Sequence, residues 1–500
     1  MRIVVISTYI HPSRLPLKER GVMQSSVPEL IAGLCPDHAQ VELYNEKEAD
    51  IPLNGNWDLV FFSYLHSYYE HTKVLSRRLR DRGIKTVAGG RHTVHFADDC
   101  EKYFDAIVTG EPEANVPAVI RDFEKGRLQK RYSFASAGPV EIKPYRYDLI
   151  DFRTNSIRLP GIEASRGCPF TCNFCVLTGH EKYRYRPIEH VINEIKFKMH
   201  WNKNYFGLFD NTFSFLDNNL GGNPRYLREL CEALIPLKKN WGCAVTFNVL
   251  KDDALVKLMS RAGCGYVYTG LESLNPDSVR AMNKGQNNVG EVDSVIRRCF
   301  SSGIMLSFGL LVGSDGDTNE YLMRLPQYLS ELQYFNVTFL GIVCPYPETP
   351  FYQELKVAGR ILPGTISRDY DGYTLCHRPL KLQPGEVVEH YQRLCRQLGS
   401  VTNVGRHYLS KLGASDLPRY KKVILASGPE ILSISSPLKN KQRKYIAGLD
   451  AIEDWDRQQM HELGLEPQYI SARSSANSQE YTCTRAALCP SELLALDELS

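Results

Sequence analysis

The chain has 500 residues, and its 60 lysines and arginines nearly balance its 57 acidic residues, giving a formal net charge of +3. This balance disfavours a nucleic-acid-binding protein. Hydrophobic residues make up 43% and charged residues 23%, which excludes a chain that is disordered throughout. No apolar run reaches the length of a membrane-spanning helix, and the apolar start, MRIVVIS, is too short for a signal peptide. We therefore expect a cytoplasmic protein without a transmembrane segment and with about three domains.

The first part of the chain alternates short apolar runs with helical stretches. The predicted strands are Ile3–Ile6, Val41–Tyr44, Leu59–Phe62, Thr86–Ala88 and Ala106–Val108. The predicted helices between them are Val27–Leu34, Glu70–Arg82 and Val116–Lys125. This alternation predicts a doubly wound, Rossmann-like parallel sheet of the α/β class over residues 1–127. An irregular stretch containing Gly138, Pro139 and Pro144 predicts a linker over residues 128–159.

A second domain, residues 160–355, repeats the strand–helix unit six times. The predicted strands are Ile162–Ser165, Phe206–Asp210, Ala244–Val249, Tyr266–Leu271, Met305–Val312 and Val337–Cys344. The predicted helices are Ile188–Met199, Tyr226–Leu237, Ala254–Ala262, Val292–Phe300 and Tyr321–Leu332, the last kinked or restarted at Pro326. Six units predict a partial (β/α)6 barrel whose ligands lie at the carboxyl ends of the strands. Beyond it we expect a mixed, mainly helical C-terminal region over residues 356–470 and a flexible tail over 471–500.

Three of the 14 cysteines lie within eight residues, in the sequence Cys168-Pro169-Phe170-Thr171-Cys172-Asn173-Phe174-Cys175. Their C-x-x-x-C-x-x-C spacing follows the first predicted barrel strand, which places them on a loop at the ligand end of the barrel. Three thiolates can bind three irons of a cubane cluster and leave the fourth iron open, as a chemical role requires. Zinc is the alternative, but a structural zinc site needs a fourth ligand and only His180 is close in sequence.

This spacing resembles the signature of the radical SAM enzymes, C-x-x-x-C-x-aromatic-C, with Phe174 in the aromatic position. The resemblance implies a 4Fe-4S cluster on Cys168, Cys172 and Cys175. It also implies that S-adenosylmethionine (SAM) binds the open iron and is cleaved to a 5′-deoxyadenosyl radical. The cofactors carry this chemistry, while the protein positions them.

Three later stretches resemble the family's strand-end motifs in chain order, namely Phe209-Asp210-Asn211-Thr212-Phe213, Thr269-Gly270-Leu271-Glu272-Ser273 and Phe308–Gly313. The resemblance implies that Asp210 lies near the amino group of SAM and that Glu272 and Ser273 contact SAM. The second strand lacks the family's Gly-Gly-Glu, which weakens the assignment of Asp210. The alternative for either carboxylate is a helix cap or a surface group.

The front domain resembles the cobalamin-binding domain that precedes many radical SAM barrels. The resemblance rests on Asp58-Leu59-Val60, Thr86-Val87-Ala88-Gly89-Gly90 and Asp105–Glu113. It implies that Gly89 and Gly90 let the backbone approach the corrinoid tail, since glycine has no Cβ to block a ligand. The usual D-x-H-x-x-G motif is absent, so we expect bound cobalamin to lack a histidine ligand, with His11 and His66 as packing or surface residues. The alternative is a Rossmann-like domain without cobalamin that helps to hold the substrate.

Two enzyme hypotheses follow, both with a small-molecule substrate that the sequence does not identify. The first is a cobalamin-dependent C-methyltransferase. The second is a radical SAM enzyme that rearranges, cyclises or oxidises its substrate without methyl transfer. Either needs a low-potential electron donor such as flavodoxin or ferredoxin.

Two further classes are less favoured. A methylthiotransferase acting on RNA carries three cluster cysteines in its front domain, whereas this front domain has only Cys35 and Cys100. A non-catalytic corrinoid or iron–sulfur sensor would have no use for the strand-end motifs that this chain retains.

Overall fold

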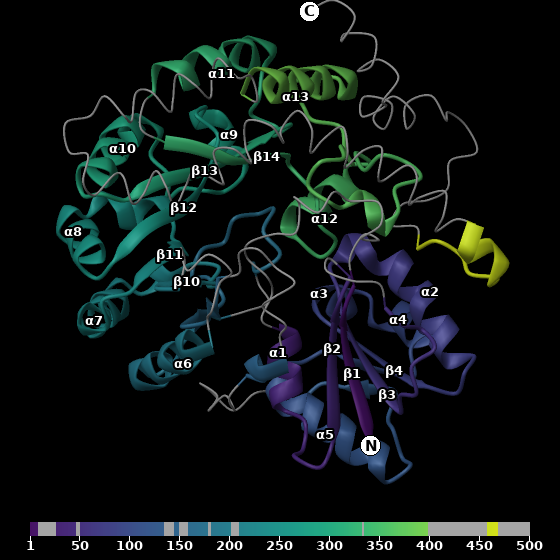
Figure 1. Cartoon of the computed structure of the whole chain (residues 1–500). Coiled ribbons are helices and arrows are strands. Elements are labelled where there is room, and N and C mark those ends of the chain that lie inside the picture. Colours follow the sequence, from purple (N-terminus) through teal and green to yellow (C-terminus); the bar gives the residue numbers. More distant parts are fainter. Residues whose placement is uncertain are drawn as a thin grey trace, which may run out of the picture.

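Two parallel sheets, each packed with helices, organise the protein and lie side by side in Figure 1. The computed structural model describes residues 1–8, 27–46, 51–134, 145–149, 159–178, 182–201, 210–332, 335–398 and 458–468. No helix within these ranges is long and apolar enough to cross a membrane.

The front sheet has the strand order β2-β1-β3-β4-β5-β6, and every pair is parallel. Its strands are β1 (Arg2–Ser7), β2 (Gln40–Asn45), β3 (Leu59–Ser63), β4 (Lys85–Gly89), β5 (Ala106–Val108) and β6 (Arg131–Tyr132). The order changes direction between β1 and β3, so the sheet is doubly wound and the predicted fold class is confirmed. β6 lies in the segment expected to be linker, because two residues are too few to give a pattern in the sequence.

Helices cover both faces of the front sheet. They are α1 (Val27–Gly33), α2 (Tyr69–Arg80), α3 (Arg91–His95), α4 (Ala97–Tyr103) and α5 (Pro112–Glu124). α1 and α5 bury apolar side chains against one face, whereas α2 and α4 bury theirs against the other. The prediction missed α3 and α4, because these short segments carry no apolar stripe of helical period.

The barrel sheet has the order β7-β10-β11-β12-β13-β14, again with every pair parallel. Its strands are β7 (Gly161–Ile162), β10 (Thr212–Phe215), β11 (Asn240–Ala244), β12 (Cys264–Glu272), β13 (Met305–Val312) and β14 (Phe335–Ile342). Its helices are α6 (Ile188–Trp201), α7 (Pro224–Leu234), α8 (Asp253–Arg261), α9 (Pro276–Ala281), α10 (Val292–Ser301) and α11 (Asn319–Glu331). In the described part of the chain the edge strands β7 and β14 do not pair with each other, so the six-stranded barrel is open.

β12 and β14 differ from the prediction by one or two residues at their ends, and three other barrel strands differ more. β7 ends at Ile162, and Ser165 instead belongs to a small antiparallel hairpin of β8 (Ser165–Arg166) and β9 (Arg184–Tyr185). β11 ends where its predicted strand began, at Ala244. β10 begins two residues after Asp210, and residues 202–209 lie outside the described ranges. In each case the apolar alternation extends beyond the strand, so periodicity alone does not fix where pairing starts.

α11 is continuous across Pro326, so the expected restart does not occur. Proline has no N–H to donate to the carbonyl four residues earlier, which belongs to Leu322. That carbonyl accepts a hydrogen bond from Nη2 of Arg393 at 2.9 Å. Arg393 lies on α13 (Pro384–Leu398), which packs beside α11 in Figure 1. A neighbouring helix therefore replaces the missing backbone bond.

Chain segments that follow the barrel pack against α2 of the front domain. Ser367 Oγ and the backbone N–H of Gln468 both donate to Oε1 of Glu70, each at 2.9 Å. Glu70 forms a buried ion pair with Lys73, whose Nζ also donates to the carbonyl of Glu466 at 2.7 Å. α12 (Pro350–Val357) crosses the predicted end of the barrel domain, and α13 is a helix of the predicted C-terminal region. Residues 399–457 and 469–470 of that region, and the tail 471–500, lie outside the described ranges.

Candidate active site

The cysteine loop, Cys168–Cys175, lies at the carboxyl edge of the barrel sheet, directly after β7 and β8. Backbone turns curl it: the N–H of Cys175 donates to the carbonyl of Cys172 at 3.1 Å, and the N–H of Thr178 donates to Cys175 at 3.0 Å. Thr178 Oγ1 also donates to the carbonyl of Cys172 at 2.7 Å. The turns bring the three sulfurs close enough for Cys168 and Cys172 to act electrostatically on Cys175.

The donor set fits an iron–sulfur cluster better than zinc. Burial raises the pKa of the Cys172 and Cys175 thiols, so a cation or metal is needed to hold them as thiolates. Across the described ranges, no three His, Cys, Asp or Glu side chains are placed to hold a single metal ion. In a cubane cluster each thiolate binds a different iron, so the three sulfurs need not converge on one point.

A loop formed by residues 281–287 joins the cysteine loop to the end of β12. On one side, Asn173 Nδ2 donates to the carbonyl of Ala281 at 2.9 Å, and Asn283 Nδ2 donates to that of Thr171 at 2.7 Å. On the other, Asn287 Nδ2 donates to the carbonyls of Gly270 and Leu271 at 3.0 and 2.9 Å. Sequence analysis missed this loop, whose one signal is the polar, glycine-containing stretch M-N-K-G-Q-N.

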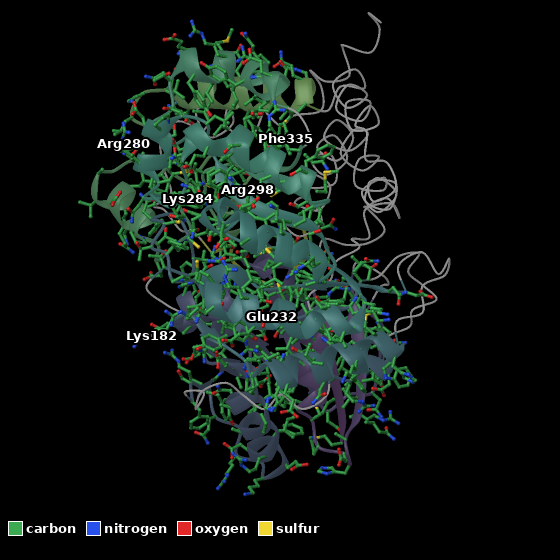
Figure 2. All side chains as sticks on the ribbon, turned by 90° about the vertical axis from the view of Figure 1, so that its left-hand side faces the viewer. Lys182, Glu232, Arg280, Lys284, Arg298 and Phe335 are labelled. Atoms are coloured by element: carbon green, nitrogen blue, oxygen red, sulfur yellow. The ribbon has the colours of Figure 1, made fainter. Side chains whose placement is uncertain are left out.

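Glu272 forms a buried ion pair with Lys284 of this loop. The backbone of Glu272 has φ +64°, a strained value for a residue other than glycine. The charge of Lys284 lowers the pKa of the Cys172 thiol, against the larger effect of burial. The side chain of Lys284 is 8% exposed, whereas that of Arg280 is 73% exposed. Both residues are labelled in Figure 2. Lys284 therefore places a shielded positive charge beside the cysteine loop.

Phe174 and Ser273, two of the other predicted SAM residues, lie near this pair. Phe174 packs against the apolar cluster of Met282 and Phe351, with Lys284 Nζ 5.9 Å from its ring centre. Ser273 is buried, and its hydroxyl donates to the hydroxyl of Tyr321 at 2.9 Å. The Ser273 hydroxyl is thus already engaged within the protein.

The expected position of Asp210 is wrong. It precedes β10, so it lies at the amino edge of the sheet, opposite the cysteine loop. The carboxylate beyond the carboxyl end of β10 is Asp217, which is buried and accepts from Ala164 N at 3.1 Å and Ser165 Oγ at 2.5 Å. Burial raises the pKa of Asp217 to about 7. Asp217 holds β8 in place, just before the cysteine loop.

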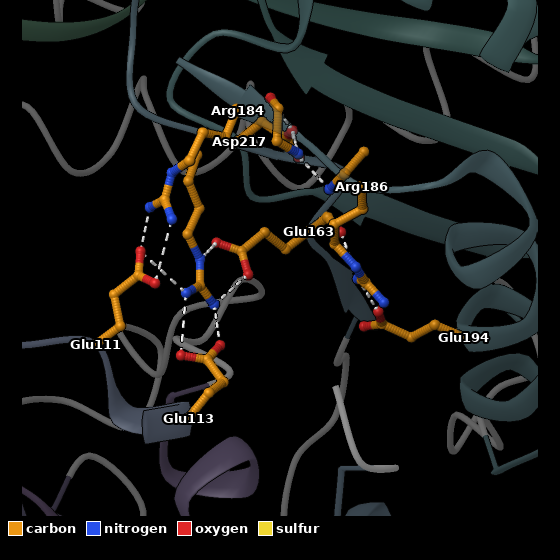
Figure 3. Close-up of polar contacts among 10 residues, drawn as sticks. Glu111, Glu113, Glu163, Arg184, Arg186, Glu194 and Asp217 are labelled. Carbon is orange, nitrogen blue, oxygen red and sulfur yellow. Dashed lines mark hydrogen bonds and ion pairs between the residues drawn. The ribbon is translucent and has the colours of Figure 1, made fainter. Parts of the chain in front are cut away.

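Two contacts join the cysteine loop to the front domain. Nη1 of Arg91, the residue after Gly90, donates to the carbonyl of Val176 at 3.3 Å. Arg166 pairs with Glu113 at the start of α5 and with Glu163. Both glutamates are labelled in Figure 3. The two carboxyl edges therefore meet at the cysteine loop.

A second arginine extends the charged junction shown in Figure 3. Arg184 on β9 pairs with Glu111, which precedes α5. Arg166 Nη1 also lies 3.5 Å from Glu111. The G-E-P-E stretch that follows β5 thus supplies both front-domain carboxylates of this network.

Gly89 and Gly90 end β4 at this junction, but their surroundings differ. Gly90 is exposed and has φ +111° and ψ 179°, a combination that essentially only glycine adopts. A Cβ on Gly89 would make only ordinary contacts, the nearest 3.8 Å from Val108. The backbone conformation at position 90 therefore requires glycine, whereas the surroundings of position 89 would accept a Cβ.

His66 follows β3 and packs within an aromatic group. Its ring lies 4.5 Å from that of His92 and 5.7 Å from that of Tyr370, and its Nδ1 is 2.7 Å from Nδ1 of His92. Burial lowers the pKa of His66 to about 3. The structure therefore places His66 as a packing residue, while His11 lies outside the described ranges.

Known proteins resemble this chain both in sequence and in structure. Residues 162–329 match the model of the Radical SAM superfamily. The chain is 26% identical over 380 residues to bacteriochlorophyllide d C-12(1)-methyltransferase of Chlorobaculum tepidum, covering 74% of this chain and 81% of that protein. It is 29% identical over 369 residues to bacteriochlorophyllide d C-8(2)-methyltransferase of the same organism, covering 70% and 79%.

A solved structure shares the fold over the whole length. The cobalamin-dependent S-adenosylmethionine radical enzyme OxsB, with aqua-cobalamin and S-adenosylmethionine bound, aligns with a TM-score of 0.63 at 11% identity, covering 100% of this chain and 80% of that one. The radical SAM match covers residues 162–329, about a third of this chain, and includes the cysteine loop and the barrel strands β10 to β13.

Proposed function

We propose that the protein is a cobalamin-dependent radical SAM methyltransferase that acts on a carbon atom of a small molecule. The observation that carries the proposal is the contact between Arg91, next to Gly90 on the front sheet, and Val176, next to Cys175. Ligands of both kinds of sheet bind at these carboxyl edges, so two cofactors there can serve one substrate. The two bacteriochlorophyllide relatives support methylation, since both are methyltransferases that match at least 70% of this chain.

Named residues have distinct roles in this proposal. Cys168, Cys172 and Cys175 hold three irons and leave the fourth open to SAM. Lys284 and Glu272 would present paired charges to the cluster from beside Cys172, and Phe174 covers the apolar side of the cysteine loop. When bound, the cluster supplies the electron that cleaves SAM, and cobalamin carries the methyl group.

The front sheet completes the site. Gly89 and Gly90 border the cobalamin at the carboxyl edge of β4. The Arg91–Val176 contact and the ion pairs of Arg166 hold this edge against the cysteine loop.

The first experiment tests cofactor loading. After anaerobic reconstitution with iron, sulfide and hydroxocobalamin, we expect about four irons and one cobalamin per chain. The triple replacement of Cys168, Cys172 and Cys175 by alanine removes the iron. Cys299→Ala is the matched control, because Cys299 is a buried thiol on α10, outside the cysteine loop. A triple variant that keeps its iron would contradict the cysteine assignment.

The products of SAM distinguish methyl transfer from other radical chemistry. S-Adenosylhomocysteine accompanies 5′-deoxyadenosine only if SAM also donates a methyl group. Turnover that gives 5′-deoxyadenosine alone would favour the rearrangement, cyclisation or oxidation hypothesis. The reductant we propose is a low-potential flavodoxin or ferredoxin. We expect that either protein can replace a chemical reductant in this assay.

A further inference from the structure

Each sulfur of the cysteine loop accepts one N–H hydrogen bond. The backbone N–H of Leu177 donates to Cys175. The other two donors are side-chain amides from distant parts of the barrel: Asn219 Nδ2 lies 3.7 Å from Cys168 Sγ, and Gln286 Nε2 lies 3.3 Å from Cys172 Sγ. The backbone turns of the cysteine loop do not use these two side-chain amides. We therefore consider what their contacts with the sulfurs do chemically.

Asn219 can be oriented in only one way. Its side chain is fully buried, and Oδ1 accepts the backbone N–H of Thr246 at 3.2 Å. Only the amide oxygen can accept this N–H, so the amide nitrogen must face Cys168. The assignment of donor and acceptor therefore follows from the backbone of a neighbouring segment.

Gln286 belongs to the 281–287 loop that joins the cysteine loop to β12. Its target, Cys172, is 8% exposed, so little water competes with the amide for the sulfur. The same loop provides a useful contrast: Asn283 donates to the carbonyl and hydroxyl oxygens of Thr171 instead of to a sulfur.

We propose that Asn219 and Gln286 raise the reduction potential of the cluster by donating to two of its thiolate ligands. Reduction adds one electron from an external low-potential reductant, with no bond formed or broken. The added negative charge spreads onto the sulfurs, where an N–H donor stabilises the reduced state more than the oxidised state. The inference rests on the cysteine assignment made above.

The test measures potential instead of turnover. The protein is reconstituted with iron and sulfide, SAM is omitted, and the reduced cluster is followed by electron paramagnetic resonance during a redox titration. Gln286→Leu removes the donor and keeps the volume. Asn219→Asp removes the donor and keeps the oxygen that accepts from Thr246. Asn283→Gly is the matched control, because glycine tolerates the φ of +49° found there.

We expect Gln286→Leu to lower the ratio of reduced to oxidised cluster about tenfold at a fixed potential, or about 59 mV for one electron. Asn219→Asp and Gln286→Glu each lower the ratio further, because a carboxylate also adds negative charge. Asn283→Gly leaves it unchanged. If fully loaded Gln286→Leu and Asn219→Asp variants have the same reduction potential as the wild type, this inference alone is overturned. An equal shift of the potential in the control also overturns it. A wild-type protein that binds no cluster overturns the cysteine assignment as well.

Discussion

Arg166, two residues before Cys168, forms a bidentate ion pair with Glu113 of the front domain, with N–O distances of 2.5 and 3.1 Å. The same guanidinium binds Glu163 through Nε and Nη2, at 2.7 and 2.8 Å. One side chain thus connects the cysteine loop to both sheets.

Replacing Arg166 by methionine leaves the carboxylate of Glu113, 3% exposed, without its cation. We expect the free energy of unfolding to fall by about 3–5 kcal/mol, as when one partner of a buried ion pair is removed. Urea unfolding of the metal-free protein measures this. Arg184→Met is the matched control, since its pair with Glu111 is more exposed and contributes less than about 1 kcal/mol. Equal losses in the two variants would contradict a special role for Arg166.

Glu272→Gln removes a charge from the buried pair with Lys284 and leaves that lysine unpaired. We expect SAM binding, measured by equilibrium dialysis, to weaken at least tenfold, or about 1.4 kcal/mol. The unfolding free energy should also fall by about 3–5 kcal/mol. The double variant Glu272→Gln/Lys284→Met removes both charges, so stability recovers while SAM binding does not. Recovery of both together would mean that the pair serves only the fold.

Asp217 predicts a pH dependence of stability. Burial raises its pKa to about 7 in the folded protein, against about 4 in the unfolded chain. Between these values the unfolded chain has lost the proton and the folded protein keeps it, so this contribution to stability is complete below about pH 4 and is lost as the pH rises to about 7. Relative to Asp217→Asn, the wild type should therefore lose up to about 4 kcal/mol across this window. A pH-independent difference in urea unfolding would contradict the raised pKa.

Gly90→Ala should destabilise the protein even without cobalamin, by about 1–3 kcal/mol, because φ +111° with ψ 179° is essentially closed to other residues. Gly89→Ala should cost less than about 1 kcal/mol, since its Cβ meets nothing closer than 3.8 Å. Unfolding of the cobalamin-free proteins checks both. Equal costs would show that the strain is not specific to Gly90. Gly89 is therefore the better position at which to add bulk and measure cobalamin uptake.

The long strands could be predicted because burial on both faces makes them continuous apolar runs. The bounds predicted for β13, Met305–Val312, agree with the structure residue by residue. The four-residue β10, Thr212–Phe215, could not be placed, because the apolar run Phe206–Asp210 just before it is an equally good strand candidate in the sequence. Asp210 was displaced from the site for this reason.

The cysteine loop was predictable because its three sulfurs lie within eight residues of one another. The groups that surround those sulfurs are remote: Asn219 lies 51 residues from Cys168, and Gln286 lies 114 residues from Cys172. A single polar residue has no period, and its partner is defined only by the fold. For the same reason, the sequence does not predict that Lys284 pairs with Glu272, although it indicates Glu272 as a candidate SAM-binding residue.

One oxygen of Glu70 accepts hydrogen bonds from residues 297 and 398 positions further along the chain, Ser367 and Gln468. The ribosome delivers the N-terminus first, so α2 is made long before either donor exists. Until Glu466 and Gln468 emerge, the Glu70–Lys73 pair lacks the groups that enclose it. The front domain is made before the barrel, but it cannot finish packing until the end of the described chain folds back onto α2.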